Sequence, residues 1–228
     1  MAVHEPIAKA ARDKTLRDKA ARRAVTRDPE RTRAAILAAA TAEFTAKGLT
    51  GARVDAIAKS AGANKRMIYH YFGDKDGLYL AVLEATYEAI RVAEQALHLG
   101  DRDPVDGMRE LVLFTWRYFL AHPEFLSLLG TENLHKAAHL KRSKRIRQLH
   151  SPLVGMISGL LERGARERVF REGVDPVELY VTIAALGFFY LSNRHTLSTI
   201  FGRDLSGAKS LASREQHIVD VVLNYLKR

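Results

Sequence analysis

Residues 54–78 read VDAIAKSAGANKRMIYHYFGDKDGL, and this stretch decides the fold. Two short amphipathic segments, 54–61 and 65–72, are separated by a break at Gly62 and by Asn64, which is suited to cap the second segment. Two short helices joined by a tight, glycine-containing turn are typical of a helix-turn-helix. In that motif the N-terminal residues of the second helix face the base edges in the major groove of DNA.

The second segment has the composition of a helix that reads DNA. Ile68 and Phe72 are four residues apart and are expected to pack inward. The outward face is then formed by Lys65, Arg66, Tyr69 and His70. Arginine and lysine can bond a guanine edge, whereas tyrosine and histidine can bond phosphates or contact a thymine methyl. A short basic helix alone also fits a solvated turn between core helices, so the flanking sequence must decide.

The flanking sequence is helical in pattern throughout. Asp28-Pro29-Glu30 marks a helix start and Gly48 a helix end, and apolar residues elsewhere recur at three- and four-residue spacing without strand-like alternation. Helices are expected at 29–48, 54–61, 65–72, 76–99, 104–121, 123–148, 152–170, 176–200 and 211–227. The sequence therefore predicts an all-α fold of about nine helices, with a three-helix helix-turn-helix domain near the N-terminus.

Composition narrows the class of protein and its partner. The 228 residues carry a net charge of +10 and no cysteine, which excludes disulfides and thiolate metal sites and favours the reducing cytoplasm. Residues 29–77 hold eight Lys and Arg against five Asp and Glu, so a polyanion such as double-stranded DNA is the expected partner. Neither a secretory leader nor a membrane span is expected. No nucleophile elbow or phosphate-cradling glycine loop suggests an enzyme, and no cofactor is expected.

The ordered run TRAAIL at 32–37, Phe44 and Gly48, then VDAIAKSAG at 54–62 and YHYFGDKDGL at 69–78, resembles the DNA-binding domain of the tetracycline-repressor (TetR) family. The resemblance implies a helix-turn-helix domain at 29–77 and an effector-binding and dimerisation domain at 78–228. Residues 1–28 are polar and rich in Arg, Lys and Ala, which predicts a basic flexible arm before these domains. The resemblance also implies a transcription regulator, most simply a repressor, that a small-molecule effector releases from a palindromic operator. The homodimer would form through the last two helices.

The resemblance assigns DNA-contacting roles to particular residues. Recognition-helix contacts fall to Lys65, Arg66, Tyr69, His70 and Tyr71, and Lys75 would hold a phosphate.

The chain departs from the family pattern at three places. Arg53 stands where Ser or Thr is common and offers a further phosphate cation in place of a capping hydroxyl, and Asn64 replaces the usual Ser as a cap. Arg66-Met67 stands where Gly-Thr is frequent, so Arg66 could read a base directly.

Polar groups embedded among apolar ones are the candidates for effector binding. The predicted ligand residues are Trp116, Tyr118, Glu132, Asn133, His139, Phe189 and Asn193. The stretches around Asn133 and Asn193 resemble a TetR subgroup near the nicotinate-degradation repressor and, more distantly, the pyrimidine-utilisation repressor. That resemblance implies a planar heterocycle or aromatic acid as effector.

Several alternatives stay open at this point. Glu132, His135 and His139 would share one helical face, so they form part of a ligand pocket, a divalent-metal site, or a solvent face that continues into the basic run 136–147. The arm is either a minor-groove contact through Arg22, Arg23, Arg27 and Arg31 or a disordered tail. The rival functions are a DNA-binding protein without a small-molecule effector and, with less support, a helical enzyme.

Overall fold

The computed structural model describes residues 29–228, except for the side chains of Arg147, Leu149, His150 and Ser151. The predicted arm at 1–28 lies outside the described residues, and so do the candidate minor-groove arginines Arg22, Arg23 and Arg27, whereas Arg31 lies in the first described helix. Residues 29–228 contain nine α-helices, two short 3₁₀ turns and a single isolated antiparallel bridge between Phe170 and Lys227. The predicted all-α fold is therefore confirmed. No helix in this part of the chain is long and apolar enough to cross a membrane.

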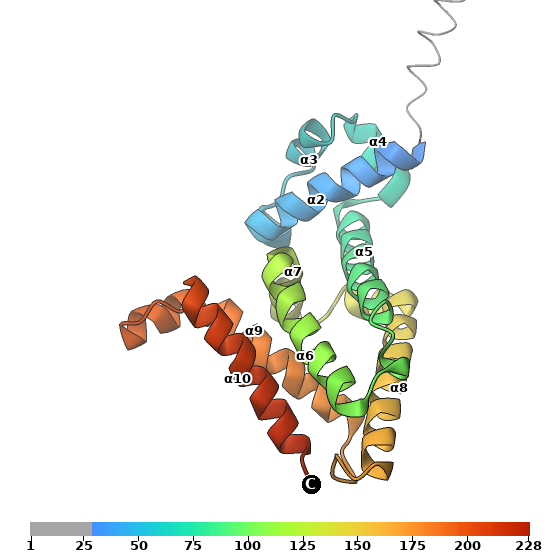
Figure 1. Ribbon diagram of the computed structural model, residues 1–228. Coiled ribbons are helices and arrows are strands. Elements are labelled where there is room, and N and C mark those ends of the chain that lie inside the picture. Colours follow the sequence, from blue (N-terminus) through green and yellow to red (C-terminus); the bar gives the residue numbers. More distant parts are fainter. Residues whose placement is uncertain (1–28) are drawn as a thin grey trace, which may run out of the picture.

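One long and two short helices form one end of the molecule, and a fourth helix leads away from it (Figure 1). These are α2 (Pro29–Gly51), α3 (Val54–Ser60), α4 (Lys65–Phe72) and α5 (Lys75–Gln95). Gly48 leaves the helical conformation at φ +65°, as its predicted role as a helix end requires, and one further turn follows it. We call α2, α3, α4 and the start of α5 the head.

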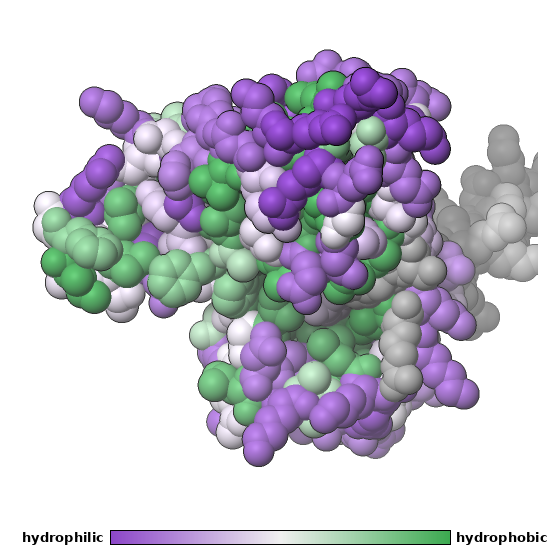
Figure 2. Space-filling model, turned by 90° about the horizontal axis from the view of Figure 1, so that it is seen from below, coloured by the Kyte–Doolittle hydropathy of each residue, from purple (hydrophilic) through white to green (hydrophobic). Residues whose placement is uncertain are grey.

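The remaining helices form the larger part of the molecule, which we call the body. They are η1 (Leu99–Asp101), α6 (Pro104–Ala121), α7 (Pro123–Leu134), η2 (Leu140–Arg142), α8 (Lys144–Arg166), α9 (Pro176–Phe201) and α10 (Ala208–Leu226). Asp103 and Asp175 cap α6 and α9, and each is followed by a proline at the first helical position. The far end of α9 projects sideways, and apolar side chains gather on that projection (Figures 1 and 2).

Two hydrophobic cores hold the chain together. The head core is built around Ile36, Phe44, Ile57 and Ile68, all at most 1 % exposed, and it extends down α5. The body core collects residues of α6, α8, α9 and α10 around Trp116. Helix α5 contributes to both cores and connects the head directly to the body. Helices α7 and α8 also place residues in both cores, Leu128 and Ile146 in the head core and Phe125 and Leu153 in the body core.

The helix predicted at 123–148 is wrong in its second half. Helix α7 ends at Leu134, and Lys136 and Ala137 then adopt positive φ values of 55° and 57°. The Ala137 amide donates to the Glu132 carbonyl over 2.8 Å, which closes the helix end in a tight turn. Because Glu132 and His139 therefore belong to different elements, they do not lie along one helical face as predicted.

The helix break predicted at Ser151-Pro152 is also wrong, because α8 runs through Pro152. An interior proline costs a helix about 3 kcal/mol. Here Pro152 is exposed, whereas Leu153, Ile157 and Leu160 of the same helix are at most 1 % exposed. Burial of one such side chain contributes about 1.5–3 kcal/mol, so the three together outweigh the lost hydrogen bond.

Candidate nucleic-acid interface and effector region

Helix α4 is fixed to the head by one fully buried side chain. Ile68 is its only buried residue and packs into the head core with Ile36, Ile57 and Leu78. Lys65, Arg66, Tyr69 and His70 are exposed, as the sequence predicted for the outer face. Because a single apolar anchor is buried, most of the α4 surface is free to contact another molecule.

The N-terminus of α4 concentrates positive charge. The Asn64 side chain accepts a hydrogen bond from the Arg66 amide over 2.9 Å, which confirms its predicted role as cap. Lys65 and Arg66 open the helix, and no acid lies in its first turn. Cations at this end oppose the helix dipole, so the arrangement is unfavourable in isolation and suits a nearby anion. Lys65 has one acidic neighbour, Asp55 of α3, at 2.8 Å.

The aromatic residues of α4 form a partly exposed cluster beside these cations. The ring of Tyr71 is half-buried and lies 5.3 Å from the ring of His70 and 6.2 Å from that of Phe72. Arg33 of α2 sits over the Phe72 ring at 5.3 Å. Tyr69 is 44 % exposed and projects from the same helix.

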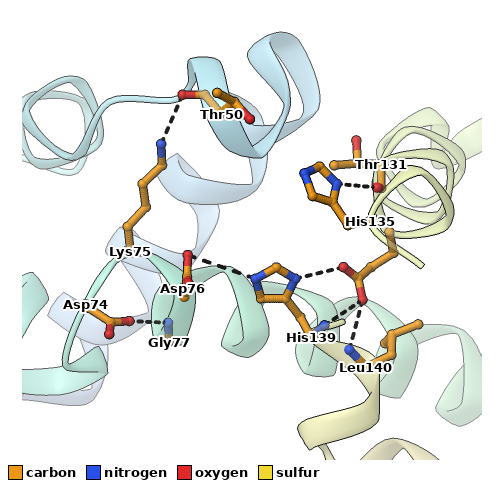
Figure 3. Close-up of polar contacts among 10 residues, drawn as sticks. Thr50, Asp74, Lys75, Asp76, Gly77, Thr131, His135, His139 and Leu140 are labelled. Carbon is orange, nitrogen blue, oxygen red and sulfur yellow. Dashed lines mark hydrogen bonds and ion pairs between the residues drawn. The ribbon is translucent and has the colours of Figure 1, made fainter. Parts of the chain in front are cut away.

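Two further predicted cations flank α4. The Lys75 ammonium donates to the Thr50 carbonyl over 3.3 Å, which ties the start of α5 to the end of α2 (Figure 3). Arg53 is the N-terminal cap residue of α3 and makes no side-chain capping bond, as expected from the loss of a hydroxyl there. The Arg53 amide instead donates a hydrogen bond to the Glu43 carboxylate. The Lys47 ammonium and this amide together lower the pKa of the Glu43 carboxyl.

A turn with no room for a side chain sets the direction of α5 relative to α4. Gly73 has φ +80°, and the Asp74 carboxylate accepts the Gly77 amide over 2.7 Å (Figure 3). A Cβ atom on Gly77 would lie 2.1 Å from the Phe72 carbonyl oxygen. The angle at which α5 leaves the head therefore depends on glycine at position 77.

The seven predicted effector residues do not meet in one place. Trp116 is buried in the body core against the Tyr190 ring, and Tyr118 is half-buried and stacks on His122 at 4.1 Å. Asn133 is exposed and Asn193 half-buried, and each donates its amide to a carbonyl one turn earlier in its own helix.

Phe189 is exposed and lies one turn before Asn193 on α9. A cleft of about 460 Å³ between α7 and α9 passes close to these residues, but Phe188, Ser192 and Thr131 line it rather than the predicted ones.

Glu132 and His139 are the predicted residues that the structure does bring together. The buried Glu132 carboxylate accepts from His139 Nδ1 over 2.9 Å and from the amides of His139 and Leu140 (Figure 3). His139 Nε2 lies 3.9 Å from Asp76 in the first turn of α5, and its ring meets that of Tyr79 edge-on at 5.0 Å. This junction joins the α7–α8 connection to the start of α5.

His135 is not part of that junction. It is exposed, and its Nδ1 lies 2.8 Å from the Thr131 carbonyl (Figure 3). The described residues contain no group of three or more histidines and acids arranged to hold a metal ion. The geometry thus gives the metal alternative no support.

A buried ion pair in the body was missed by the sequence analysis. Arg91 and Glu94 of α5 are 2 % and 1 % exposed, and Arg91 NH1 lies 3.0 Å from Glu94 Oε2. Arg91 NH2 also donates to the Tyr180 hydroxyl of α9 over 2.9 Å. Burial raises the pKa of Glu94 to about 7, against the opposing effect of Arg91. A signal was available, because positions 83, 90 and 94 follow the helical spacing of the buried α5 stripe.

Comparisons with known protein families agree with this architecture. The family profile described as "Bacterial regulatory proteins, tetR family" matches residues 36–82, and the one described as "Tetracyclin repressor-like, C-terminal domain" matches residues 104–222. Together they cover the head and most of the body.

Individual relatives are similar over most of their length. The chain is 41 % identical over 199 residues to the HTH-type transcriptional repressor NicS of Pseudomonas putida, covering 87 % of this chain and 94 % of NicS. It is 37 % identical to the HTH-type transcriptional repressor SCO4008 of Streptomyces coelicolor, over 60 % of this chain and 69 % of that one. The crystal structure of the transcriptional regulator SCO4942 of Streptomyces coelicolor superposes with a TM-score of 0.65 at 26 % identity, covering 86 % of this chain and 98 % of the other.

We predict that Gly77→Ala weakens the head. The new Cβ meets a backbone carbonyl at 2.1 Å, so α4 and α5 must move apart. Thermal unfolding should show a loss of about 2 kcal/mol or more, together with weaker DNA binding. Gly155→Ala on the exposed side of α8, where nothing lies within 4 Å of the new Cβ, is the control and should be neutral or stabilising by up to about 1 kcal/mol. Equal behaviour of the two variants would contradict the packing argument.

We predict that Glu94→Gln stabilises the protein in a pH-dependent way. Because the folded-state pKa of about 7 lies above the ordinary 4.5, the native protein loses stability as pH rises between these values, whereas glutamine carries no charge. Urea unfolding should show little difference at about pH 4.5 and an advantage for the variant on the order of 2–3 kcal/mol above pH 7. The exposed Glu172→Gln is the control and should show no such trend. A pH-independent difference for Glu94→Gln would contradict the burial of an acid with a raised pKa.

Proposed function

Because the chain belongs to the TetR family of bacterial regulatory proteins, we propose that it is a transcriptional repressor that a small molecule releases from a palindromic operator. The observation that carries the proposal is helix α4, whose exposed face holds Lys65, Arg66, Tyr69 and His70 over a single buried anchor. Repression is supported by the names of NicS and SCO4008, which are both called transcriptional repressors.

In the proposed complex α4 lies in the major groove. Arg66, exposed in the first turn, reads a guanine edge. Lys65 leaves its ion pair with Asp55 and contacts the DNA instead. Arg53 and Lys75 flank the helix and hold phosphates. Tyr69, His70 and Tyr71 supply phosphate or thymine-methyl contacts from the same helix, while Asn64 acts through its cap.

The proposed homodimer uses α9 and α10. Exposed apolar residues recur on α9 every four positions, at Val177, Val181, Ala185 and Phe189. The apolar residues of α10 divide into two sets: Ile218, Val222 and Leu226 are buried within the chain, whereas Val221 and Tyr225 are exposed. An exposed apolar stripe of this length supports the proposal that a helix of a second copy packs against it.

The arrangement of a symmetric dimer determines the form of the operator. Pairing α9 and α10 with their symmetry mates is isologous, so the two copies of α4 would face the same side of the DNA in opposite orientations, related by the two-fold axis. Major-groove readers of this kind sit about 34–36 Å apart, one turn of DNA. The proposed operator is therefore palindromic, with half-sites separated by about one helical turn.

Effector release would act through α5. This helix begins beside the DNA-reading helix, where Lys75 bonds Thr50, and ends in the body, where Arg91 bonds Tyr180. A ligand that prefers one position of α5 within the body shifts the population of head positions, and hence the spacing of the two α4 helices. We take the effector to be an aromatic or N-heterocyclic metabolite. The role of the seven predicted residues in binding this effector stays a prediction.

We expect Arg66→Ala to relax base preference at one operator position and to cost about 1–3 kcal/mol. Lys75→Ala should instead weaken binding evenly across sequences and reduce the salt slope by about one. Mobility shifts with single-base operator variants across a salt series separate the two effects. Lys209→Ala, exposed on α10, is the control and should change neither. An unaltered base preference in Arg66→Ala would remove that residue from direct readout.

Val181→Asp should dissociate the dimer, because a charge would be buried at the centre of the α9 stripe. Sedimentation should show a monomer, with operator affinity reduced because each monomer engages a single half-site. Val92→Asp is the matched control, since Val92 is a comparably exposed helical valine on α5, 59 % exposed against 53 % for Val181. A Val181→Asp protein that sediments as a dimer would exclude α9 from the interface.

A further inference from the structure

The buried Arg91–Glu94 pair occupies a place where several helices meet. Both residues lie in the second half of α5, which packs against α8 and α6. Helix α9 reaches the pair through Tyr180, whose ring lies 5.4 Å from the Arg91 guanidinium carbon. The pair is therefore enclosed by the body, far along α5 from the DNA-reading helix.

The chain itself does not satisfy the hydrogen-bonding capacity of this pair. One guanidinium nitrogen, NH2, donates to the Tyr180 hydroxyl. Arg91 Nε and NH1 have no hydrogen-bond acceptor within the described residues, and neither Glu94 oxygen has a donor. The 3.0 Å contact between NH1 and Oε2 has the distance of an ion pair but not the angle of a hydrogen bond. Buried polar groups in folded proteins nearly always have partners, so donors and acceptors left over here point to a further molecule.

The charges around the pair indicate which kind of molecule fits. Arginine stays protonated at any relevant pH, whereas burial raises the pKa of Glu94 to about 7, so Glu94 can be neutral under cellular conditions. The titratable neighbours within the described residues are Tyr180 of α9, Tyr118 of α6 and Tyr87 of α5, and burial raises the pKa of each. None of them supplies a second negative charge near neutral pH. A neutral Glu94 leaves one uncompensated buried cation, which favours an anion.

The walls around the pair are aromatic. Tyr180 presents its ring to Arg91, and Tyr87 meets Phe125 edge-on at 5.4 Å. Tyr118 meets the same Phe125 ring at 6.3 Å. Aromatic rings pair by offset stacking or edge-to-face contact, and a planar ligand can contact these side chains in the same two ways. The surroundings thus combine a guanidinium, which matches a carboxylate in shape, with surfaces suited to a planar ligand.

We propose that Arg91 and Glu94 form the recognition site for an aromatic carboxylic acid, with Arg91 binding the carboxylate and protonated Glu94 donating a hydrogen bond to the ligand. The inference rests on the proposed release by a small molecule and names the chemical class of that molecule. The ligand carboxylate takes the place of Glu94 as the counterion of Arg91. Since both residues belong to α5, the exchange acts on the helix that leads to the head.

Calorimetric titration of the full-length protein with four ring probes tests the charge class. Benzoate and nicotinate carry the proposed carboxylate, benzamide has the same shape without charge, and benzylamine carries the opposite charge. We expect the carboxylates to bind about 10- to 100-fold more tightly than the amide or the amine and to release operator DNA. Tighter binding of benzylamine would assign the site to a cation held by Glu94, and no detectable binding of either carboxylate would overturn the proposal.

Variants of the pair test the assigned residues. Arg91→Met should weaken carboxylate binding about 10- to 100-fold, whereas Glu94→Gln, which resembles the neutral acid, should keep it within a few fold. Arg117→Met is the control, because Arg117 is an exposed arginine of the body paired with Glu215. If Arg91→Met alone does not fold, the double variant Arg91→Met with Glu94→Gln removes both charges at once. Proteins often tolerate the loss of a whole buried ion pair better than the loss of one partner.

Operator binding without ligand is the measurement that separates the proposed ligand site from the proposed function as a repressor. Operator binding by both variants shows that the head and dimer are intact, so unchanged carboxylate affinity in Arg91→Met then rejects this site alone. Release of operator by a neutral or cationic compound, unaffected by Arg91→Met, would also reject the site while leaving effector-controlled repression in place. Failure of the native protein to bind any operator would reject the proposed function itself.

Discussion

Helix α5 runs from the head core into the body core, and the rest of the structure depends on this constraint. The first turns of α5 place Leu78, Tyr79 and Val82 in the head core, and Ile90 lies in the body core three turns later. An α-helix transmits displacement because its backbone hydrogen bonds resist stretching and bending. A rotation or tilt of α5 therefore cannot be confined to either core. The head has to follow what happens around the lower half of α5.

A second set of contacts, from α7 and α8, fixes the head against the body, so the head does not move freely about a single hinge. Leu128 of α7 and Ile146 of α8 are buried in the head core, although both helices belong to the body. Ser127 of α7 also donates to the Thr45 carbonyl of α2. The Glu132–His139 junction then fixes the α7–α8 connection beside Asp76 at the start of α5. Packed interfaces of this kind favour a few discrete arrangements over continuous flexing, which is the property that a two-state regulator requires.

The sequence predicted the head well because each signal there is local. Asn64 as cap, Gly48 as helix end and Ile68 as anchor follow from backbone conformation and helical spacing, and the structure agrees. The α7–α8 region was predicted wrongly because its determinants are not local. A proline suggested a break that burial of Leu153 and its neighbours overrides, and the actual end of α7 depends on the carboxylate of Glu132 reaching across a turn.

The Arg91–Glu94 pair shows why the proposed interior site was not predicted from the sequence. A basic and an acidic residue three positions apart on a helix normally indicate a solvated face, and only their register with the apolar stripe of α5 places them inside. A buried ion pair seldom increases stability, since apolar residues of similar volume would serve the fold as well or better. Proteins are marginally stable, so a cost of this kind is tolerated where the charges have another use. The cost falls on α5, which contributes to both cores and follows α4 directly in the chain. The proposed site of chemical recognition therefore lies on the element whose position sets the direction of the DNA-reading helix.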